Sequence, residues 1–485
     1  MEKLLLQKKK QKKDFFSICK TKMEIEKISE SCIKPSSPTP PHLKTYKISL
    51  LDQFLAYNAD IPLILFYLND HPHLADHDFI SERSELLKQS LSIALAHYYP
   101  LAGRIKDHLS VDCNDEGAYY VKARASIALS EYLTEPDHLT SMYKLLPRQP
   151  SSYESSAPGA YPVMIQETAF ACGSVAIGVF ASHMVMDAGS MISFIKTWAA
   201  ITSSNTGVSR EIESPIFDGQ SVFPPYVGFP KEATMVAFDE FLIQTGNLGT
   251  RRVVFSESGI AKLKAEAANS TVEKPTRIEA VSSFLFECIS YTLNARRDMH
   301  DKSLAFTYIT TLRHKTIPPL PKNLFGNFIV MAPGLCSPDE MKLTSLACKV
   351  REAIQKIDVE FVKKVQSDGG FSMLNEKMKE ATKTVNSDGV NFVMISSLCN
   401  LGIYDIDFGW GKPLWVTCID LPPNSTIYVN SIVLLDSGKG RGIEAWVFLD
   451  EQDLVLFEKY EKLLQHALIN PCPISNHLQA PSSAM

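Results

Sequence analysis

One stretch of the chain lacks any secondary-structure period and accumulates prolines. Between about Ser203 and Gly249 neither the helical nor the strand repeat of apolar residues persists. The prolines of this stretch are Pro215, Pro224, Pro225 and Pro230. Such a segment is typical of a long connection between domains. The chain has 485 residues, and one hydrophobic core rarely serves more than about 250–300 residues, so we expect at least two domains that meet near this segment.

Both sides of this connection alternate between strands and helices. In the first half, strands are predicted at Lys47–Leu51, Tyr119–Ala123 and Val175–Ala181, and helices at Ser84–Tyr98 and Met191–Ile201. In the second half, strands are predicted at Arg252–Phe255, Leu304–Thr311 and Glu444–Leu449, and helices at Gly259–Ala268, Arg277–Leu293 and Leu343–Lys364. This alternation predicts a mixed α/β (α+β) fold with two domains of similar size.

The predicted division of the chain has five parts. They are a basic extension at residues 1–22, a first domain at 23–203, a crossover at 204–249, a second domain at 250–469 and a frayed tail at 470–485. The extension carries eight lysines against Glu2 and Asp14, a net charge of +6, so the rest carries −11 of the total −5. It has the pattern of neither a signal peptide nor a transit peptide. A disordered tail ahead of a start at Met23 and a contact with an anionic surface both stay open.

Composition excludes several classes of protein. Apolar residues make up 45% and charged residues 21% of the chain, as in average soluble globular proteins. The longest apolar run, Ile61–Leu68, is far shorter than the roughly 18 residues of a membrane-spanning helix. Ten cysteines without a CxxC pair favour reduced thiols in the cytosol over a disulfide framework or a zinc site. The acidic body lacks the basic stripe of a nucleic-acid-binding protein.

The first candidate catalytic residue follows the apolar strand Val175–Ala181. His183 opens the sequence HMVMD, which ends at Asp187 and continues to Gly189. A histidine at the end of a strand can act as a general base, because its ordinary pKa lies near neutrality. A histidine beside apolar residues can equally be a satisfied core residue. The same HxxxD spacing recurs at His108–Asp112, in a polar segment where we expect the histidine to face solvent.

The second candidate segment has the sequence DFGWG. Its residues are Asp407, Phe408, Gly409, Trp410 and Gly411. A protein kinase would also need an HRD-type catalytic loop and a glycine-rich phosphate loop, and the chain has neither. As a structural element, two glycines around a tryptophan predict a tight turn packed under an aromatic side chain.

Other motifs point to structure rather than chemistry. Gly438, Gly440 and Gly442 stand between two strand-like runs, which suits a hairpin turn better than a nucleotide-binding loop. The histidines at 71, 73 and 77 stand with Asp76 and Asp78 in a polar loop, where we do not expect a metal site. The chain has no GxSxG sequence, so a serine hydrolase of the α/β type has no support.

Together, His183–Gly189 and Asp407–Gly411 resemble the two signatures, HxxxD(G) and DFGWG, of the plant BAHD acyltransferase family. The resemblance extends from about Ile33 to Phe457. Supporting matches are Ser49–Gln53, Tyr99–Arg104, Val111–Asn114, Thr276–Glu279, Gly326–Asn327 and Gly442–Ala445. Within the family the chain is most similar to the branch that contains vinorine synthase, salutaridinol and deacetylvindoline acetyltransferases and the acylsugar acyltransferases.

The resemblance implies two chloramphenicol-acetyltransferase-like domains with a solvent channel between them. It also implies transfer of an acyl group from acyl-CoA to an alcohol, with His183 as the general base and no permanently bound cofactor or metal. Asp187 is implied to turn away from the substrate and to pair with an arginine, for which Arg313 is our candidate. The DFGWG segment is implied to support the channel and the CoA side, with Trp410 near the channel. Asp407 stands with His183 and Asp187 among the candidate catalytic residues; the resemblance favours a structural role for it and leaves a role as second proton acceptor open.

The chain departs from the family pattern at three positions. Ala188 separates Asp187 from Gly189, where a glycine often follows the aspartate directly. Leu398 and Asn400 stand where many relatives have Trp and Arg, and the resemblance places those positions near the acyl or acceptor pocket. The acceptor of a relative therefore cannot simply be transferred to this chain.

Three functions follow from the sequence. The first is a monomeric, cytoplasmic O-acyltransferase that moves an acetyl group from acetyl-CoA to a hydroxyl of a specialised metabolite such as an alkaloid. The second is acylation of a sugar ester with a short or branched acyl-CoA by the same residues. The third is a catalytically silent binding protein of the same fold, against which the intact His183 and Asp187 argue. None of the three needs a nucleic acid or a membrane as a partner.

Overall fold

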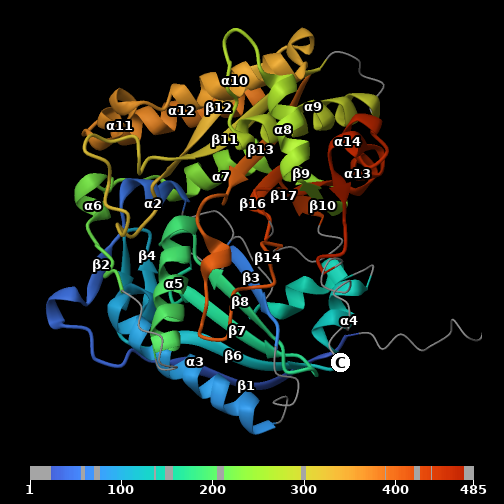
Figure 1. The fold of residues 1–485 in the computed structure, drawn as a ribbon. Coiled ribbons are helices and arrows are strands. Elements are labelled where there is room, and N and C mark those ends of the chain that lie inside the picture. Colours follow the sequence, from blue (N-terminus) through green and yellow to red (C-terminus); the bar gives the residue numbers. More distant parts are fainter. Residues whose placement is uncertain are drawn as a thin grey trace, which may run out of the picture.

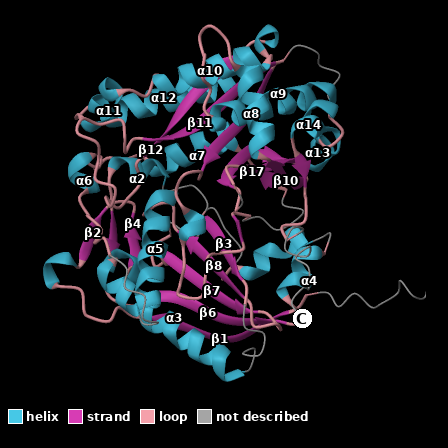
Figure 2. Cartoon of the chain, viewed as in Figure 1, coloured by secondary structure: helices cyan, strands magenta, loops and turns pink. Residues whose placement is uncertain are grey.

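The computed structural model describes residues 23–55, 60–69, 77–135, 138–147, 157–204, 212–296, 302–387, 389–419, 426–438 and 440–474. These residues form two α/β lobes, the first below the second in Figure 1, and each lobe is built on one large sheet. Figure 2 shows helices lying over both sheets. The predicted basic extension and the loop histidines at 71 and 73 lie outside the described residues.

The sheet of the first lobe has six strands in the order β1-β6-β7-β8-β3-β14. These strands are β1 (Ile25–Ile33), β3 (Ile61–Tyr67), β6 (Ala118–Ala125), β7 (Val163–Ala169), β8 (Val175–Ala181) and β14 (Trp415–Thr417). The last of them comes from the C-terminal half of the chain, and Trp415 pairs with Phe66 of β3. The second half of the chain therefore contributes a strand to the sheet of the first lobe, and the predicted domain boundaries stay a prediction.

Both faces of this first sheet are covered, which explains the nearly unbroken apolar character of its central strands. Successive residues of β7 point to opposite faces. Glu167 accepts a hydrogen bond from Ser84 of α3 (His77–His97), whereas Gln166 donates to the carbonyl of Lys144 in η4 (His138–Leu145). On the α3 side, α5 (Ala188–Ser204) packs along the same helix, and the indole of Trp198 donates to Leu87. The strand end that carries His183 is thus held by packing on both sides.

The sheet of the second lobe has seven strands in the order β12-β11-β13-β16-β17-β10-β18. They are β10 (Leu248–Phe255), β11 (Ser303–Thr311), β12 (Ile329–Cys336), β13 (Val390–Ser397), β16 (Ser431–Asp436), β17 (Ile443–Asp450) and β18 (Leu468–Ile469). Along β17, Ala445 and Val447 join the core of this lobe, whereas Trp446 and Phe448 join the core shared with the first lobe. This alternation is the strand period, and it makes the sheet the layer that both cores share.

Two groups of helices cover the two faces of the second sheet. The group in the core of the second lobe comprises α8 (Glu257–Ala267), α9 (Arg277–Arg296), α10 (Leu343–Gln355), α11 (Val359–Gln366), α13 (Glu451–Phe457) and α14 (Glu461–His466). On the other face, α7 (Lys231–Leu242) packs on α12 (Gly370–Val385), and Phe238 and Leu242 of α7 are buried in the shared core.

The remaining elements are short. They are β2 (Thr45–Lys47), β4 (Arg104–Asp107), β5 (Ser110–Asp112), β9 (Gln244–Thr245), β15 (Ile427–Tyr428), α2 (Leu50–Leu55), α4 (Leu129–Thr134), α6 (Gly219–Val222), η1 (Pro41–Leu43), η3 (Tyr99–Ala102), η5 (Pro338–Glu340) and η6 (Ile403–Asp405). Strands β2, β5 and β4 form a three-stranded sheet, and β15 pairs with β9.

Several elements predicted from the sequence are confirmed. The strand Val175–Ala181 coincides with β8, and the predicted helix Ser84–Tyr98 forms the later part of α3. Strands β16 and β17, which flank Gly438, Gly440 and Gly442, pair as an antiparallel hairpin. No helix in the described ranges is both long and apolar enough to cross a membrane.

One predicted element type and the continuity of one predicted helix are wrong, and a side-chain cap marks the place in each case. Lys47–Leu51 is not a strand, because a helix begins at Leu50. Asp52 accepts from the backbone of Ser49, and Ser49 Oγ accepts from the backbone of Asp52, which is the reciprocal pattern of a capping box. The helix predicted at Leu343–Lys364 is broken, because the Asp358 side chain accepts from the backbone of Phe361 and starts α11 anew.

Two further expectations are also corrected. The crossover is not without periodicity, since Thr234, Phe238 and Leu242 bury one face of α7 at intervals of four residues. The chain is not frayed directly after Ile469. The backbone of Arg252 donates to the Asn470 side chain, and the Arg252 guanidinium donates to the carbonyl of Pro471.

Candidate active site

His183 lies in the turn that joins β8 to α5. The turn is closed by backbone hydrogen bonds from Val185 and Met186 to the carbonyl of Ser182. Because β8 is buried along its whole length, the chain enters this turn from a rigid support. The His183 side chain is only partly buried by surface area, but it stands deep enough for desolvation to lower its pKa, with Asp187 acting in the opposite direction. A neutral imidazole is therefore favoured at neutral pH.

Asn327, from the second lobe, holds the ring of His183. His183 Nδ1 lies 3.0 Å from Asn327 Oδ1, and Asn327 Nδ2 donates to the His183 carbonyl at 2.8 Å. Because an amide oxygen only accepts, the proton of the neutral imidazole belongs on Nδ1. Nε2 is then left with a lone pair, which is the arrangement a general base needs. His183 and the residue that orients its ring thus come from different lobes.

Asp187 and Arg313 form a bidentate ion pair behind this turn. Arg313 Nη1 lies 2.5 Å from Asp187 Oδ2, and Arg313 Nη2 lies 3.1 Å from Asp187 Oδ1. The carboxylate also accepts from the backbone of Ser190 at 2.8 Å and of Phe328 at 3.0 Å. Although burial raises the pKa of Asp187, Arg313 and the backbone donors outweigh it and lower the pKa overall. All four donors engage the carboxylate, so Asp187 is an anchor between the lobes.

The close approach of Arg313 depends on a small residue at position 189. A Cβ at Gly189 would lie 3.3 Å from Asp187 Oδ1 and 3.6 Å from Arg313 Cζ. The first distance is tighter than an ordinary van der Waals contact, and the second is an ordinary one. Ser190 completes the junction, because its hydroxyl donates to the carbonyl of Gly326 and accepts from Arg313 Nη2. Gly326 has a φ of +134°, a conformation that favours glycine. These residues fix the loop that carries Asn327.

Asp407 is not brought to His183. Its Oδ1 accepts from the backbone of Gly409 at 2.8 Å and of Gly411 at 2.9 Å. The same loop is anchored to Tyr67, whose hydroxyl donates to the carbonyl of Ile406. Tyr67 pairs with Val175 at the beginning of β8, whereas His183 follows its end. A strand rises about 3.3 Å per residue, so these two ends lie about 20 Å apart.

The aromatic residues of the DFGWG segment fasten its loop to the first lobe. Phe408 is fully buried, and its ring meets Trp198 of α5 edge-on with 4.9 Å between centroids. Trp410 stacks on Phe408 at 5.6 Å, and both rings also contact Tyr67. Gly409 and Gly411 have φ values of +105° and +104°, so the turn requires glycine at both positions. The loop leads directly into β14, the strand that the second half contributes to the first sheet.

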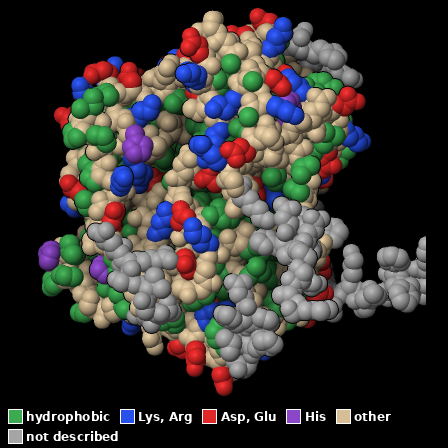
Figure 3. Space-filling view, viewed as in Figure 1, with side chains coloured by type: hydrophobic (Ala, Val, Ile, Leu, Met, Phe, Trp, Pro, Cys, Tyr) green, Lys and Arg blue, Asp and Glu red, His purple; other side chains and the backbone are tan. Residues whose placement is uncertain are grey.

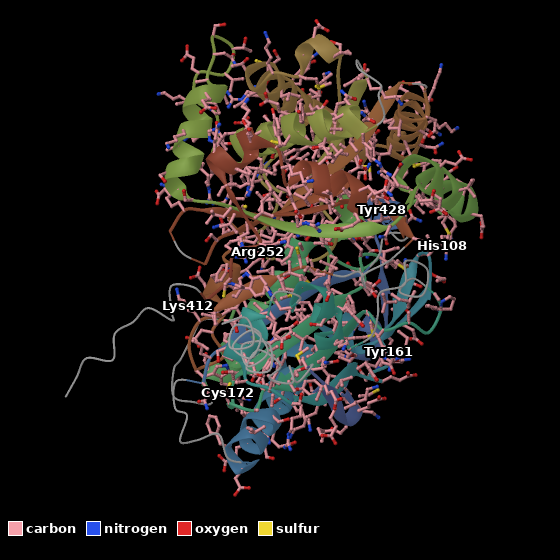
Figure 4. All side chains as sticks on the ribbon, turned by 90° about the vertical axis from the view of Figure 1, so that its right-hand side faces the viewer. His108, Tyr161, Cys172, Arg252, Lys412 and Tyr428 are labelled. Atoms are coloured by element: carbon pink, nitrogen blue, oxygen red, sulfur yellow. The ribbon has the colours of Figure 1, made fainter. Side chains whose placement is uncertain are left out.

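The second HxxxD sequence forms no comparable site. His108 lies in the turn between β4 and β5 of the small sheet, where Figure 4 labels it. Within the described ranges, no group of three metal-ligating residues could hold a metal ion, and no disulfide joins any of the nine described cysteines. On the face drawn in Figure 3, basic and acidic side chains of the described residues are intermixed.

Two residues of this site were quoted from the sequence without a role. Asn327 stands in the Gly326–Asn327 match, and Asp52 stands in the Ser49–Gln53 match. Asn327 is 144 residues from His183 along the chain, and Asp52 is 275 residues from Asn327. The Ser-x-x-Asp cap could have located α2 from the sequence. The contacts with Asn327 depend on how the two lobes meet, so local pattern carries no signal for them.

Comparison with known proteins shows which family the chain is similar to. The profile of the Transferase family matches residues 23–464. An epi-neemfruitin B 7-O-acetyltransferase of Melia azedarach is 39% identical over 93% of this chain and 100% of its own length. Akuammiline synthase 2 of Alstonia scholaris is 35% identical over 93% of this chain and 98% of its own length. The crystal structure of vinorine synthase superposes with a TM-score of 0.72 at 29% identity, covering 91% of this chain and 98% of that one.

The chain belongs to the Transferase family, the BAHD acyltransferases. It is an acyltransferase with the mixed α/β two-domain fold of that family. Its acyl donor is an acyl-CoA.

Proposed function

We propose that the protein is an acetyl-CoA-dependent O-acetyltransferase in which His183 is the general base. Nε2 takes the proton of the acceptor hydroxyl while its oxygen attacks the thioester carbon. The oxygen–acyl carbon bond forms and the carbon–sulfur bond breaks, so CoA leaves as a thiolate and receives the proton from the imidazolium. Donor and acceptor react within one ternary complex, without an acyl-enzyme or a permanently bound cofactor. The Asn327–His183 hydrogen bond carries this proposal, because it supports a free Nε2 lone pair.

The other predicted site residues take supporting roles in this proposal. Asp187 and Arg313 hold the loop of Asn327 against the turn of His183, and Gly189 gives them room. Asp407 acts by closing the turn that Phe408, Gly409, Trp410 and Gly411 complete, and it exchanges no proton with the substrates. This assignment follows from the two backbone donors on its carboxylate and from its place at the other end of β8.

We propose a hydroxyl of a rigid polycyclic metabolite as the acceptor. The relatives from Melia azedarach and Citrus sinensis that are 39% identical to this chain are named as 7-O-acetyltransferases of epi-neemfruitin B and of a limonoid. A limonoid-type alcohol is therefore the first candidate. An alkaloid alcohol is the second, because akuammiline synthase 2 and stemmadenine O-acetyltransferase of Catharanthus roseus are 35% and 34% identical to it. We further propose that the enzyme works as a cytoplasmic monomer.

The test measures acceptor-dependent release of CoA and the mass of the product. Purified protein is given acetyl-CoA and, separately, a branched acyl-CoA, each with limonoid alcohols, alkaloid alcohols and sucrose esters. We expect a product heavier by one acetyl group with a polycyclic alcohol. Turnover only with sucrose esters would favour the acylsugar alternative. No acceptor-dependent CoA release with any class would favour the silent binding protein.

A matched pair of variants tests the base. His183→Ala should abolish transfer while the circular dichroism spectrum and the melting temperature stay close to those of the wild type. His108→Ala removes the histidine of the second HxxxD sequence and should leave turnover unchanged. Transfer by His183→Ala at a rate near that of the wild type would refute the mechanism.

A further inference from the structure

Asp52 is a buried carboxylate with a complete set of hydrogen-bond donors beside the site. It lies on α2, and its side chain is inaccessible to solvent. Oδ1 accepts from the backbone N–H of Asn327 at 2.8 Å and from Asn327 Nδ2 at 2.7 Å. Oδ2 accepts from the backbone N–H of Ser49 at 2.6 Å and from Ser49 Oγ at 2.7 Å. Two of the four donors therefore belong to the residue that holds His183.

We propose that Asp52 is a positioning residue for acyl transfer, which holds the amide of Asn327 in one orientation and thereby keeps the proton of His183 on Nδ1. The proposal rests on the proposed function of His183 as the base. Asp52 reaches neither substrate in this scheme and acts only through Asn327.

The orientation of the Asn327 amide follows from what surrounds its nitrogen. Nδ2 faces two acceptors, Asp52 Oδ1 at 2.7 Å and the His183 carbonyl at 2.8 Å. If the amide were flipped, its oxygen would face both of these oxygens. The three atoms are all acceptors, so no hydrogen bond could form between them. It would also turn the NH₂ group toward His183 Nδ1, which would then have to accept. The proton of the imidazole would move to Nε2, and the base would lose its lone pair.

A carboxylate at position 52 locks this orientation better than a neutral side chain could. A carboxylate only accepts, whereas an asparagine could present either its oxygen or its nitrogen to Asn327. The carboxylate also comes at a cost, because burial raises the pKa of Asp52 to about 6 despite the donors from Ser49 and Asn327. A costly buried charge one hydrogen bond away from the residue that orients the base is typical of a functional site.

The first test is Asp52→Asn in the full-length protein. We expect kcat to fall about 10–100-fold, as for other residues that orient a catalytic group from behind, while KM for acetyl-CoA stays within about twofold. Ser49→Ala is the matched control, because it removes one donor from Asp52 Oδ2 and leaves both contacts with Asn327. Its kcat should stay close to that of the wild type. An unchanged kcat in Asp52→Asn would overturn the proposal.

The second test reads the tautomer of His183 directly and needs no substrate. In protein labelled with ¹⁵N-histidine, the signal lost in His183→Gln identifies His183. Above its pKa, the wild type should show a protonated Nδ1 and an unprotonated Nε2, and Asp52→Asn should show a mixed or reversed pattern. An unaltered pattern with reduced kcat would overturn the proposal. Because this readout is independent of turnover, it separates failure of the proposal from failure of the proposed function.

A double-mutant cycle distinguishes positioning from general destabilisation. If Asp52 acts through the Asn327 amide, Asp52→Asn should lower kcat no further in an Asn327→Ala background. If the double variant instead lowers kcat by the product of the two single factors, Asp52 acts by another route, and this would count against the proposal. Asp52→Ser replaces Asp52→Asn in all three experiments if the latter does not fold, with the same outcomes expected.

Discussion

Replacing Arg313 by Met should destabilise the protein far more than breaking an exposed ion pair does. Asp187 and Arg313 have side chains only 3% and 13% exposed. The substitution leaves the Asp187 carboxylate buried with only the backbone donors of Ser190 and Phe328. Removing one partner of a buried pair costs about 3–5 kcal/mol. With an unfolding entropy of about 2.1 cal/mol/K per residue, a chain of 485 residues that unfolds as one unit should melt about 3–5 °C lower.

The pH dependence of this loss tests its cause. The pKa of Asp187 is lowered by Arg313 and the backbone donors. A carboxylate whose pKa is lowered on folding stabilises the protein above its unfolded pKa of about 3.9 and loses this contribution as the pH falls through the folded value. Without Arg313, burial raises the pKa of Asp187 in the folded variant, so the difference between wild type and Arg313→Met should be largest at neutral pH and shrink as acidification protonates this carboxylate. Chemical denaturation at several pH values measures it.

Lys412→Met is the matched control for this prediction. Lys412 pairs with Asp405 at 2.8 Å, and both side chains are 66% exposed. Such exposed pairs contribute about 0–1 kcal/mol, so the melting temperature should hardly change. A loss in Arg313→Met no larger than that in Lys412→Met, or one that does not depend on pH, would refute the reasoning.

Three further predictions concern the site and the contact between the lobes. Burial lowers the pKa of His183. The pH profile of kcat/KM should therefore fall on acidification with an apparent pKa below the ordinary histidine value of about 6.5. An apparent pKa above that value would contradict the burial argument. Asp407→Ala removes two hydrogen bonds and should lower the free energy of unfolding by about 0.5–1.5 kcal/mol for each, measured by denaturation. Its kcat per folded molecule should stay unchanged. A collapse of kcat at unchanged stability would instead make Asp407 catalytic. Trp415→Phe removes the hydrogen bond from the indole to the Glu444 carboxylate. The loss of this donor should cost about 1–3 kcal/mol of stability, read from the melting temperature. An unchanged melting temperature would mean that Arg252 alone satisfies Glu444.

The sequence predicts the parts of the site that depend on local pattern. The run Val175–Ala181 forms the strand that carries His183, because an apolar run of that length fits a strand buried on both faces. The two glycines of DFGWG predict a tight turn, because glycine adopts positive φ values without strain. In the structure both glycines have positive φ values. Local pattern fails at Lys47–Leu51, where the apolar residues suit a strand but the Ser49–Asp52 cap starts a helix.

Contacts between the lobes are the part that the sequence does not predict. Arg313 could be named as the partner of Asp187 from the family resemblance, but no periodicity in the chain joins two residues that are 126 positions apart. The place of β14 in the first sheet is equally hidden. Its three residues form an edge strand beside β3, and so short a segment gives no period to detect.

The loop Leu324–Phe328 is where these hidden contacts converge. Its residues form hydrogen bonds with Arg313, Asp187, Asp52 and His183, so residues of both lobes hold this short segment in place. In the proposed mechanism, Asn327 therefore sets the tautomer of His183 only while the lobes are docked. Loosening the docking should impair turnover, because the Asn327–His183 bond spans the boundary between the lobes. In the proposed mechanism, proton transfer at His183 is thereby coupled to the docking of the two lobes.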